Sequence, residues 1–301
     1  MRRSGPVIDY QTVQQVTGPL VIIDHVRDLG SGEEVAVITP DGEVRRGEVL
    51  EVSGTRAVVE VFSGTHGLDV HTTRVRPIGH VARADVGIDL LGRVLDGTGR
   101  PRDGGPPVIA ADSRDVHGAP LNPVMRDHPS EVIQTGVSAI DALNSLVRGQ
   151  KLPIFSGFGL PADELASHIV NHASVPGAPS DSFVVVFAAL GITSREASFF
   201  RRALDEGGAL DRTVMYLSLA DDPAIERLLT PRVALTAAEY LAFDLGKHVL
   251  VVITDMTNYC EALREVATAR EEVPGRRGFP GYMYSDLASL YERSGRIVGR
   301  A

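Results

Sequence analysis

The sequence predicts a small β-barrel followed by an α/β domain in which helices cover a mostly parallel sheet. Residues 7 to about 75 alternate apolar and polar side chains in short runs, residues 76–126 are rich in Gly and Pro, and residues 127–301 contain strand patterns alternating with helix patterns. A period of two is typical of half-buried strands, and strand–helix alternation indicates a parallel sheet. We therefore predict a barrel at 1–75, an ordered connector at 76–126 and an α/β domain at 127–301.

The barrel prediction depends on short strand-like runs separated by turn residues. The runs are PLVIIDHV, EEVAVIT, GEVLEV and RAVVEVF, and Pro40-Asp41-Gly42, Ser53-Gly54-Thr55 and Gly64-Thr65-His66-Gly67 provide turn chemistry. Several short strands at this spacing favour a closed barrel.

The second domain has four expected strands and four expected helices. The strands are Leu152–Phe155, Ser182–Ala189, Val214–Leu219 and His248–Thr254, and the helices are Pro161–His172, Ser194–Glu206, Pro231–Phe243 and Tyr259–Glu271. Their alternation indicates a mostly parallel sheet covered by helices.

Composition excludes several classes of protein. The chain of 301 residues has a formal net charge of −9, which argues against nucleic acid as the main partner because phosphate backbones are bound by clustered Lys and Arg. A single cysteine, Cys260, excludes an internal disulfide framework. The longest apolar runs are too short to span a bilayer, and residues 1–11 lack an apolar signal core, so we expect a cytoplasmic protein that reaches a membrane only through other proteins.

The segment RGQKLPIFSGFGLPADELASHIV has the layout of a phosphate-binding loop without the residues that bind phosphate. An apolar strand, a glycine turn and a helix follow one another as in G-x-x-x-x-G-K-[ST], but the Lys and hydroxyl positions are Pro161 and Ala162. Proline offers neither charge nor N–H, and alanine offers no magnesium ligand. The degenerate nucleotide site consists of Ser156, Gly157, Phe158, Gly159, Pro161, Ala162 and Asp255.

Two strand ends support this interpretation. Asp255 follows the strand HVLVVITD, where P-loop proteins place the aspartate that orients Mg²⁺; the alternative is a carboxylate that caps a loop or helix. Ile192 follows the strand FVVVFAAL, where an ATP hydrolase of this architecture needs a carboxylate to orient water. We expect no catalytic residue, no tightly bound cofactor and weak or absent binding of Mg-ATP.

Other reactive residues are better explained as structural ones. His168 and His172 have the spacing of a zinc pair, but HIVNH lacks the metalloprotease glutamate and no third ligand is evident, so we predict no metal site. Cys260 has no partner that would make it a nucleophile and is interpreted as a packing residue.

The stretch REEVPGRRGFPGYMYSDL predicts a rigid exposed loop between two helices. Arg, Tyr and Phe are enriched at interface hot spots, which favours a protein contact over a solvated connector. The predicted interface residues are Arg276, Arg277, Phe279, Tyr282 and Tyr284.

Long motifs in the sequence resemble one family. KLPIFSGFGLP, TPRVALTAAEYLAFDLGKHVLVVITDM and EALREVATAREEVPGRRGFPGYMYSDLASLYERSGRI are similar to the non-catalytic B subunits of archaeal and vacuolar-type rotary ATPases, which are ATP synthases in many prokaryotes. VTGPLVIIDHV, VVEVFSGTHGLD, LGRVLDGTGRPRDGGPP and IQTGVSAIDALNSLVRGQ extend the resemblance over nearly the whole chain.

The resemblance implies an N-terminal β-barrel and a RecA-like nucleotide-fold domain. It also implies three such subunits alternating with three catalytic A subunits in a ring around a rotating stalk, attached to the cytoplasmic face of a membrane through central and peripheral stalk subunits. ATP synthesis or hydrolysis would be coupled to proton translocation, with sodium as the alternative ion. Pro161, Ala162 and Ile192 depart from a catalytic subunit in the way expected for B. Phe158, Ala162 and Asp163 depart from the small and polar residues usual in the family, which makes a residual nucleotide contact less favourable.

The end of the chain is the largest departure. Family members continue beyond ERSGRI into a further strand, a segment whose arginine reaches the neighbouring subunit's ATP, and a C-terminal helical domain. We therefore expect a truncated chain with an incomplete sheet, in which the apolar edges of LPIF and VLVVIT are unpaired.

Two other functions fit a nucleotide fold. A self-sufficient P-loop NTPase, such as an export-apparatus ATPase, is disfavoured by Pro161 and Ile192. A RecA-like nucleic-acid motor is disfavoured by the acidic charge balance.

Overall fold

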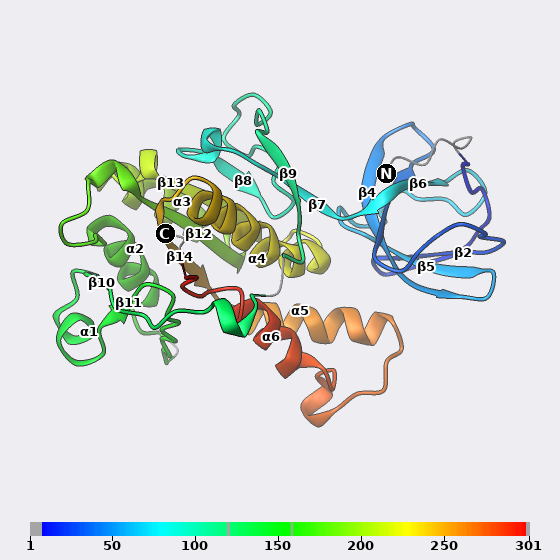
Figure 1. Cartoon of the computed structure of the whole chain (residues 1–301). Helices are drawn as coiled ribbons and strands as arrows, with labels where there is room; N and C mark the ends of the chain where they lie inside the picture. Colours follow the sequence, from blue (N-terminus) through cyan, green and yellow to red (C-terminus); the bar gives the residue numbers. More distant parts are fainter. Residues whose placement is uncertain (1–7, 119–120, 158, 299–301) are drawn as a thin grey trace. The chain divides into compact units, whose positions relative to one another are not determined.

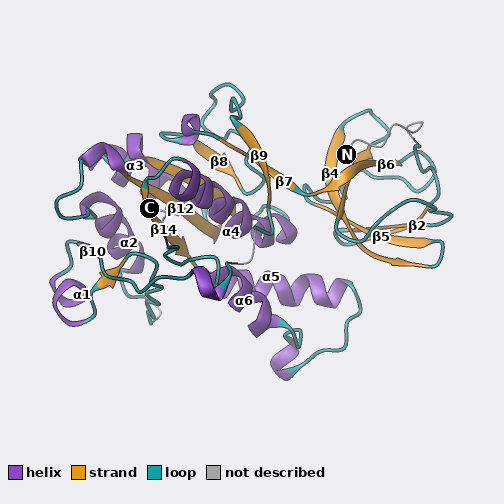
Figure 2. Cartoon of the chain, viewed as in Figure 1, coloured by secondary structure: helices purple, strands orange, loops and turns teal. Residues whose placement is uncertain are grey.

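The computed structural model describes residues 8–118, 121–157 and 159–298, which form two compact units (Figure 1). The first unit comprises residues 8–83, 222–229 and 257–283, and the second comprises the other described residues. Strands dominate the N-terminal part of the chain, and helices alternate with strands further on (Figure 2).

The first unit contains an antiparallel barrel. Its strands are β1 (Val13–Thr17), β2 (Leu20–Ile23), β3 (Glu33–Ile38), β4 (Val44–Ser53), β5 (Arg56–Val61) and β6 (Arg74–Val81), in the order β1-β2-β5-β4-β3-β6. Tyr10, just before β1, closes the sheet onto β6 through two backbone hydrogen bonds with Val75, of 2.8 and 2.9 Å. The predicted barrel is confirmed, and this bridge joins the two ends of the six-stranded sheet.

Alternation along the strands builds the barrel core. Val21, Val35, Val49, Val59 and Val75 are fully buried, and each has polar or half-exposed neighbours on the outer face or at the strand ends. The predicted boundary at residue 75 is wrong by six residues, because β6 continues to Val81 and pairs with β3 along that length. RPIGHV contains Pro and Gly, which obscured the strand pattern.

The second unit is built on a four-stranded parallel sheet. The strand order is β14 (His248–Thr254), β12 (Phe183–Ile192), β13 (Thr213–Leu219) and β8 (Val94–Asp96). In β12, nine of the ten residues are buried, as expected for a parallel strand covered on both faces. The connector prediction at 76–126 is therefore incomplete, because Val94–Asp96 joins this sheet as an edge strand.

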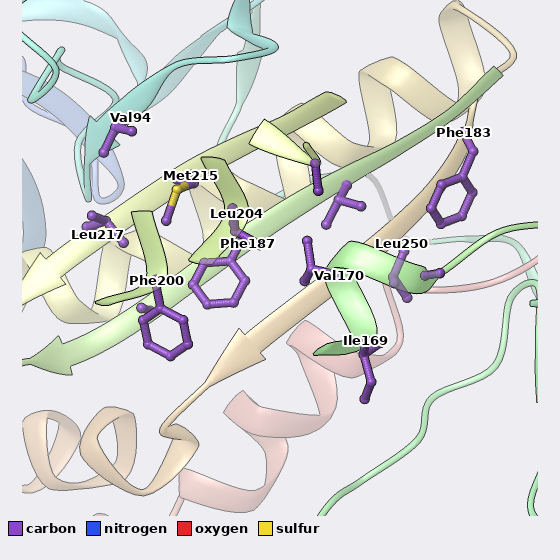
Figure 3. Close-up of a cluster of buried hydrophobic side chains, with 14 of the residues drawn as sticks. Val94, Ile169, Val170, Phe183, Phe187, Phe200, Leu204, Met215, Leu217 and Leu250 are labelled. Atoms are coloured by element: carbon purple, nitrogen blue, oxygen red, sulfur yellow. The ribbon is translucent and has the colours of Figure 1, made fainter. Parts of the chain in front are cut away.

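Helices α2 (Ala162–His172) and α3 (Ser194–Glu206) pack on one face of the sheet. Val170 of α2 and Phe200 of α3 contact the core around Phe187 of β12 (Figure 3). The rings of Phe187 and Phe200 lie 4.8 Å apart, in a tilted arrangement that aromatic pairs favour.

The remaining elements are short or connect the two units. They are β7 (Arg83–Val86), β9 (Asp112–Asp115), β10 (Val132–Ile133), β11 (Leu146–Val147), α1 (Ser138–Leu143), α4 (Ala224–Glu239), α5 (Met256–Ala269), α6 (Met283–Tyr291), a π-helical turn at Tyr240–Asp244 and single 3-10 turns at Ile88–Leu90, Pro123–Met125, Ser180–Ser182, Leu210–Arg212 and Arg276–Gly278.

Two predicted elements are corrected by the structure. Leu152–Phe155 is not a strand: no described strand pairs with it, and Phe155 is 93% exposed, so its backbone lacks the ladder that defines a strand. β14 is an edge strand, because among the described residues it pairs with β12 on one side and with no strand on the other.

The second corrected element is helix α4, which begins at Ala224, seven residues before Pro231, so that this proline lies inside the helix. Proline patterns alone place a helix start at Pro231, but Leu228 and Leu229, which precede it in the helix, are already buried.

Candidate nucleotide site

The degenerate loop lies immediately before helix α2. Gly159 has φ 81°, a conformation that glycine adopts readily, and Pro161 is the residue that precedes the helix without capping it by a side chain. The backbone N–H of Leu160 donates to the carbonyl of Gly157 at 3.2 Å. The backbone N–H of Ala162 donates to the carbonyl of Leu160 at 2.8 Å. These two amides are therefore engaged within the loop, whereas a phosphate cradle requires backbone amides that face the ligand.

The hydroxyl of Ser156 is also directed into the loop. It donates to the carbonyl of Gly157 at 3.1 Å. Ser156, Gly157, Gly159, Pro161 and Ala162 are all exposed, and Phe158 lies outside the described residues. The loop thus offers neither a positive charge nor a side chain able to hold a metal ion at the two positions that define a working phosphate loop.

Carboxylates gather around the start of α2. Asp163 and Glu164 occupy its first turn, where negative charge complements the helix dipole. Burial, followed by the charges of Glu196 and Asp255, raises the pKa of Asp163, and burial and Glu196 raise the pKa of Asp255. These shifts indicate like charges near one another, so a phosphate group at this helix terminus would be repelled.

Asp255 is brought to the predicted position. It follows β14 with φ 59°, an unusual conformation for a residue other than glycine, and Thr254 pairs with Ala189 of the adjacent strand β12. Asp255 also lies close enough to Asp163, in the first turn of α2, for its charge to raise the pKa of that carboxyl. The structure therefore brings Asp255 near the helix that follows the loop.

Ile192 is a core residue. It is 2% exposed and belongs to the hydrophobic cluster that contains Phe187 and Phe200. The next residue, Thr193, begins helix α3 through a capping box with Glu196, whose carboxylate accepts from the Thr193 backbone N–H at 2.6 Å. The end of β12 thus supplies packing and a helix start, and a carboxylate at position 192 would have to be buried.

Replacing Thr193 by alanine is expected to lower the free energy of unfolding by about 1 kcal/mol, because the Thr193 hydroxyl accepts the N–H of Glu196 in the capping box. Urea denaturation followed by circular dichroism measures the change. Ser194→Ala, one residue further on, removes an exposed hydroxyl and should change the free energy by less than about 0.5 kcal/mol. Equal effects of the two variants would contradict the assignment of the cap.

The predicted interface residues lie in and after an ordered turn. Arg276 and Arg277 are exposed, and Arg277 has φ 60° within the 3-10 turn. Phe279 is half-buried beneath the guanidinium of Arg264, 5.1 Å from the ring centre, which stiffens the turn. Tyr282 and Tyr284 are 40% and 77% exposed. Four of the five residues are thus exposed, the ring of Phe279 is partly covered, and their contact with another protein stays a prediction.

The paired histidines form a local stack. The His168 and His172 rings lie 4.0 Å apart, and their nitrogens contact the carbonyls of Gly136 and His168 at 3.2 and 2.8 Å. No group of three or more His, Cys, Asp or Glu side chains in the described ranges is arranged to hold a metal ion. Cys260 is half-buried on α5.

Two acidic residues near the site, Asp163 and Glu196, were not predicted as site residues from the sequence. Asp163 was considered only as a departure from the family pattern, and Glu196 was not considered. The signal for Glu196 was the T-x-x-E spacing of a capping box at residues 193–196, directly after a strand that ends near Asp255.

Comparison with known proteins finds a family match for the barrel and another for the α/β domain. Residues 13–79 match the family described as "ATP synthase alpha/beta family, beta-barrel domain", and residues 136–301 match "ATP synthase alpha/beta family, nucleotide-binding domain". The second match alone covers more than half of the chain. The chain belongs to the ATP synthase alpha/beta family. Membership indicates a rotary ATPase subunit that assembles within a multisubunit complex.

The matches also place the degenerate loop within the family's nucleotide-binding domain, because residues 151–162 and Asp255 lie inside the matched range. No helix in the described ranges is long and apolar enough to span a bilayer.

Proposed function

We propose that this member of the ATP synthase alpha/beta family is a non-catalytic, B-type subunit of an archaeal or vacuolar-type rotary ATPase. It would alternate with catalytic A subunits in a ring, contact central and peripheral stalk subunits, and lie at the cytoplasmic face of the membrane. Its role is structural and regulatory in an ATP synthase or ATPase coupled to proton translocation.

The observation that carries this proposal is the chemistry at the start of α2. Pro161 and Ala162 replace the lysine and hydroxyl residue of a phosphate loop, and Asp163, Glu196 and Asp255 surround the helix terminus with negative charge. Phosphoryl transfer needs cationic groups and Mg²⁺ to stabilise the charge on the transferred group. An arrangement of acids without a lysine favours a subunit that no longer turns over ATP.

A self-sufficient NTPase is the competing function. It would require a carboxylate or amide that orients water at the end of β12, and Ile192 at that position is buried in the core. A nucleic-acid motor is disfavoured by the net charge of −9.

The isolated chain is expected neither to hydrolyse ATP nor to bind Mg-ATP with a Kd below about 1 mM. The physical reason is the absence of a cation at position 161 together with the carboxylates at the helix start. Calorimetric titration with Mg-ATP measures binding, with a catalytic A subunit as the positive control. Micromolar affinity, or steady phosphate release that Asp255→Ala abolishes, would overturn the proposal.

A further inference from the structure

Glu60 faces outward from the barrel and is nevertheless 3% exposed. Its neighbours along β5, Val59 and Val61, belong to the barrel core, and successive side chains of a strand point to opposite faces. Glu60 therefore lies on the outer face, where only another segment of the chain can shield it from water.

The shielding segment is the chain that follows helix α5. Arg270 reaches Glu60 through one guanidinium nitrogen, Nη2, which donates to both carboxylate oxygens at 3.2 and 3.1 Å. Gly18, in the turn between β1 and β2, lies near the same end of α5, because a methyl group at position 18 would stand 3.4 Å from the Cβ of Ala269. The end of α5 is thus held at the barrel by the contact of Arg270 with Glu60 and lies close to the turn at Gly18.

The same arginine is connected to both ends of the loop that follows. Its Nη1 lies 3.5 Å from Oε1 of Glu272, and the hydroxyl of Tyr282 donates to that same oxygen at 3.4 Å. Glu60, Arg270, Glu272 and Tyr282 form a continuous polar chain that spans residues 271–282. The exposed Arg276 and Arg277 lie between its ends.

We propose that Arg270 is a positioning residue that fastens the loop at residues 271–282 to the outer face of the barrel, so that Arg276 and Arg277 are held for a carboxylate-bearing surface of a neighbouring subunit. This rests on the proposed function, because a ring subunit needs such a neighbour. Arginine suits the position because its planar fork can engage two carboxylates at once. The barrel, and not the loop alone, then determines where the two exposed arginines are presented.

Protonation of Glu60 makes the fastening depend on pH. Burial outweighs the attraction of Arg270 and raises the pKa of Glu60 from 4.5 to about 7, and the neighbouring acids Glu48 and Glu272 act in the same direction. With the loop detached, Glu60 would be hydrated and would titrate near its ordinary value. Between these two values the fastened state binds the extra proton, so rising pH favours detachment. We expect the equilibrium constant for detachment of the loop to be about tenfold larger at pH 8 than at pH 6.

Hydrogen exchange of the full chain, converted to protection factors that correct for the intrinsic effect of pH, tests this inference. In the wild type, amides of residues 271–282 should lose about tenfold in protection from pH 6 to pH 8. In Arg270→Met, the buried carboxylate loses its partner, so protection should fall further at pH 8 and recover in part at pH 6. In Glu60→Gln, the charge is absent, and protection should be independent of pH in this range.

Arg56→Met is the matched control, because Arg56 is an exposed barrel arginine whose removal changes the net charge by the same amount. Loop protection in Arg270→Met equal to that in Arg56→Met would overturn the proposal, as would a Glu60→Gln variant that keeps the wild-type dependence on pH. If Arg270→Met does not fold, the pH dependence of loop protection in Glu60→Gln tests the proposal by itself.

A second measurement separates this inference from the proposed function. Gel filtration with a catalytic A subunit should show complex formation by the wild type and its loss in Arg276→Glu/Arg277→Glu, whose loop protection stays close to that of the wild type. Absence of any complex with the wild type, with loop protection as expected, would contradict the proposed function while leaving the fastening intact. Unchanged assembly of the double variant would contradict the role given to the two arginines.

Discussion

Replacing Arg293 by alanine is expected to lower the free energy of unfolding by about 3–5 kcal/mol. Arg293 follows helix α6 and is 7% exposed. Its guanidinium makes two parallel bonds to the carboxylate of Glu239, at 2.7 and 2.8 Å, and donates to the carbonyl of Val116 at 2.8 Å and the hydroxyl of Thr236 at 2.9 Å. Removing it leaves Glu239, whose side chain is 21% exposed, as a largely buried charge without its partner.

Urea denaturation followed by circular dichroism checks this expectation. Arg293→Lys should recover only part of the loss, because an ammonium group cannot reproduce the paired bonds to Glu239. Arg114→Ala is the control, since that arginine is 44% exposed and its ion pairs with Asp112 and Asp244 are open to solvent, so a loss of at most about 1 kcal/mol is expected. A free energy for Arg293→Ala within about 0.5 kcal/mol of the wild type would show that the buried pair is not needed for stability.

Restoring the loop, with Pro161→Lys and Ala162→Thr together, is expected to recover measurable binding of Mg-ATP but no multiple turnover. The new lysine would offset the charges of Asp163 and Asp255, and the threonine would supply a metal ligand. Turnover should remain absent because Ile192 cannot orient water and the isolated chain has no neighbouring subunit to contribute an arginine, a group worth roughly 10³ to 10⁵ in rate in related chemistry.

Calorimetry and a coupled assay of phosphate release measure the two outcomes. Pro161→Met/Ala162→Thr is the matched control, because methionine has a similar length and no charge, and it should bind no better than the wild type. Multiple-turnover hydrolysis by the Lys/Thr variant would contradict the roles assigned to Ile192 and to a neighbouring arginine. Equal binding by the Lys and Met variants would show that charge at position 161 is not what the site lacks.

The fold class was predictable because its signals are local. Ala57, Val59 and Val61 recur at every second residue of β5, whereas β12 is almost continuously apolar, so the two patterns distinguish the barrel from the parallel sheet. Helix α3 was predicted at its observed bounds, and in the structure a capping box of Thr193 and Glu196 fixes its start. The prediction for Leu152–Phe155 was wrong because an apolar run becomes a strand only when a neighbouring strand completes its hydrogen bonds.

By itself, the sequence determined that the chain has a barrel and a nucleotide fold and that Pro161 and Ala162 stand where a lysine and a hydroxyl residue would bind phosphate and magnesium. Those conclusions depend only on residue type and spacing. The tertiary structure decided that Glu196 and Asp163 join Asp255 around the loop, and that Arg270 reaches Glu60, 210 positions away in the chain. Such contacts depend on which strand ends and outer faces are brought together by packing, and no local pattern encodes the partner of a buried charge.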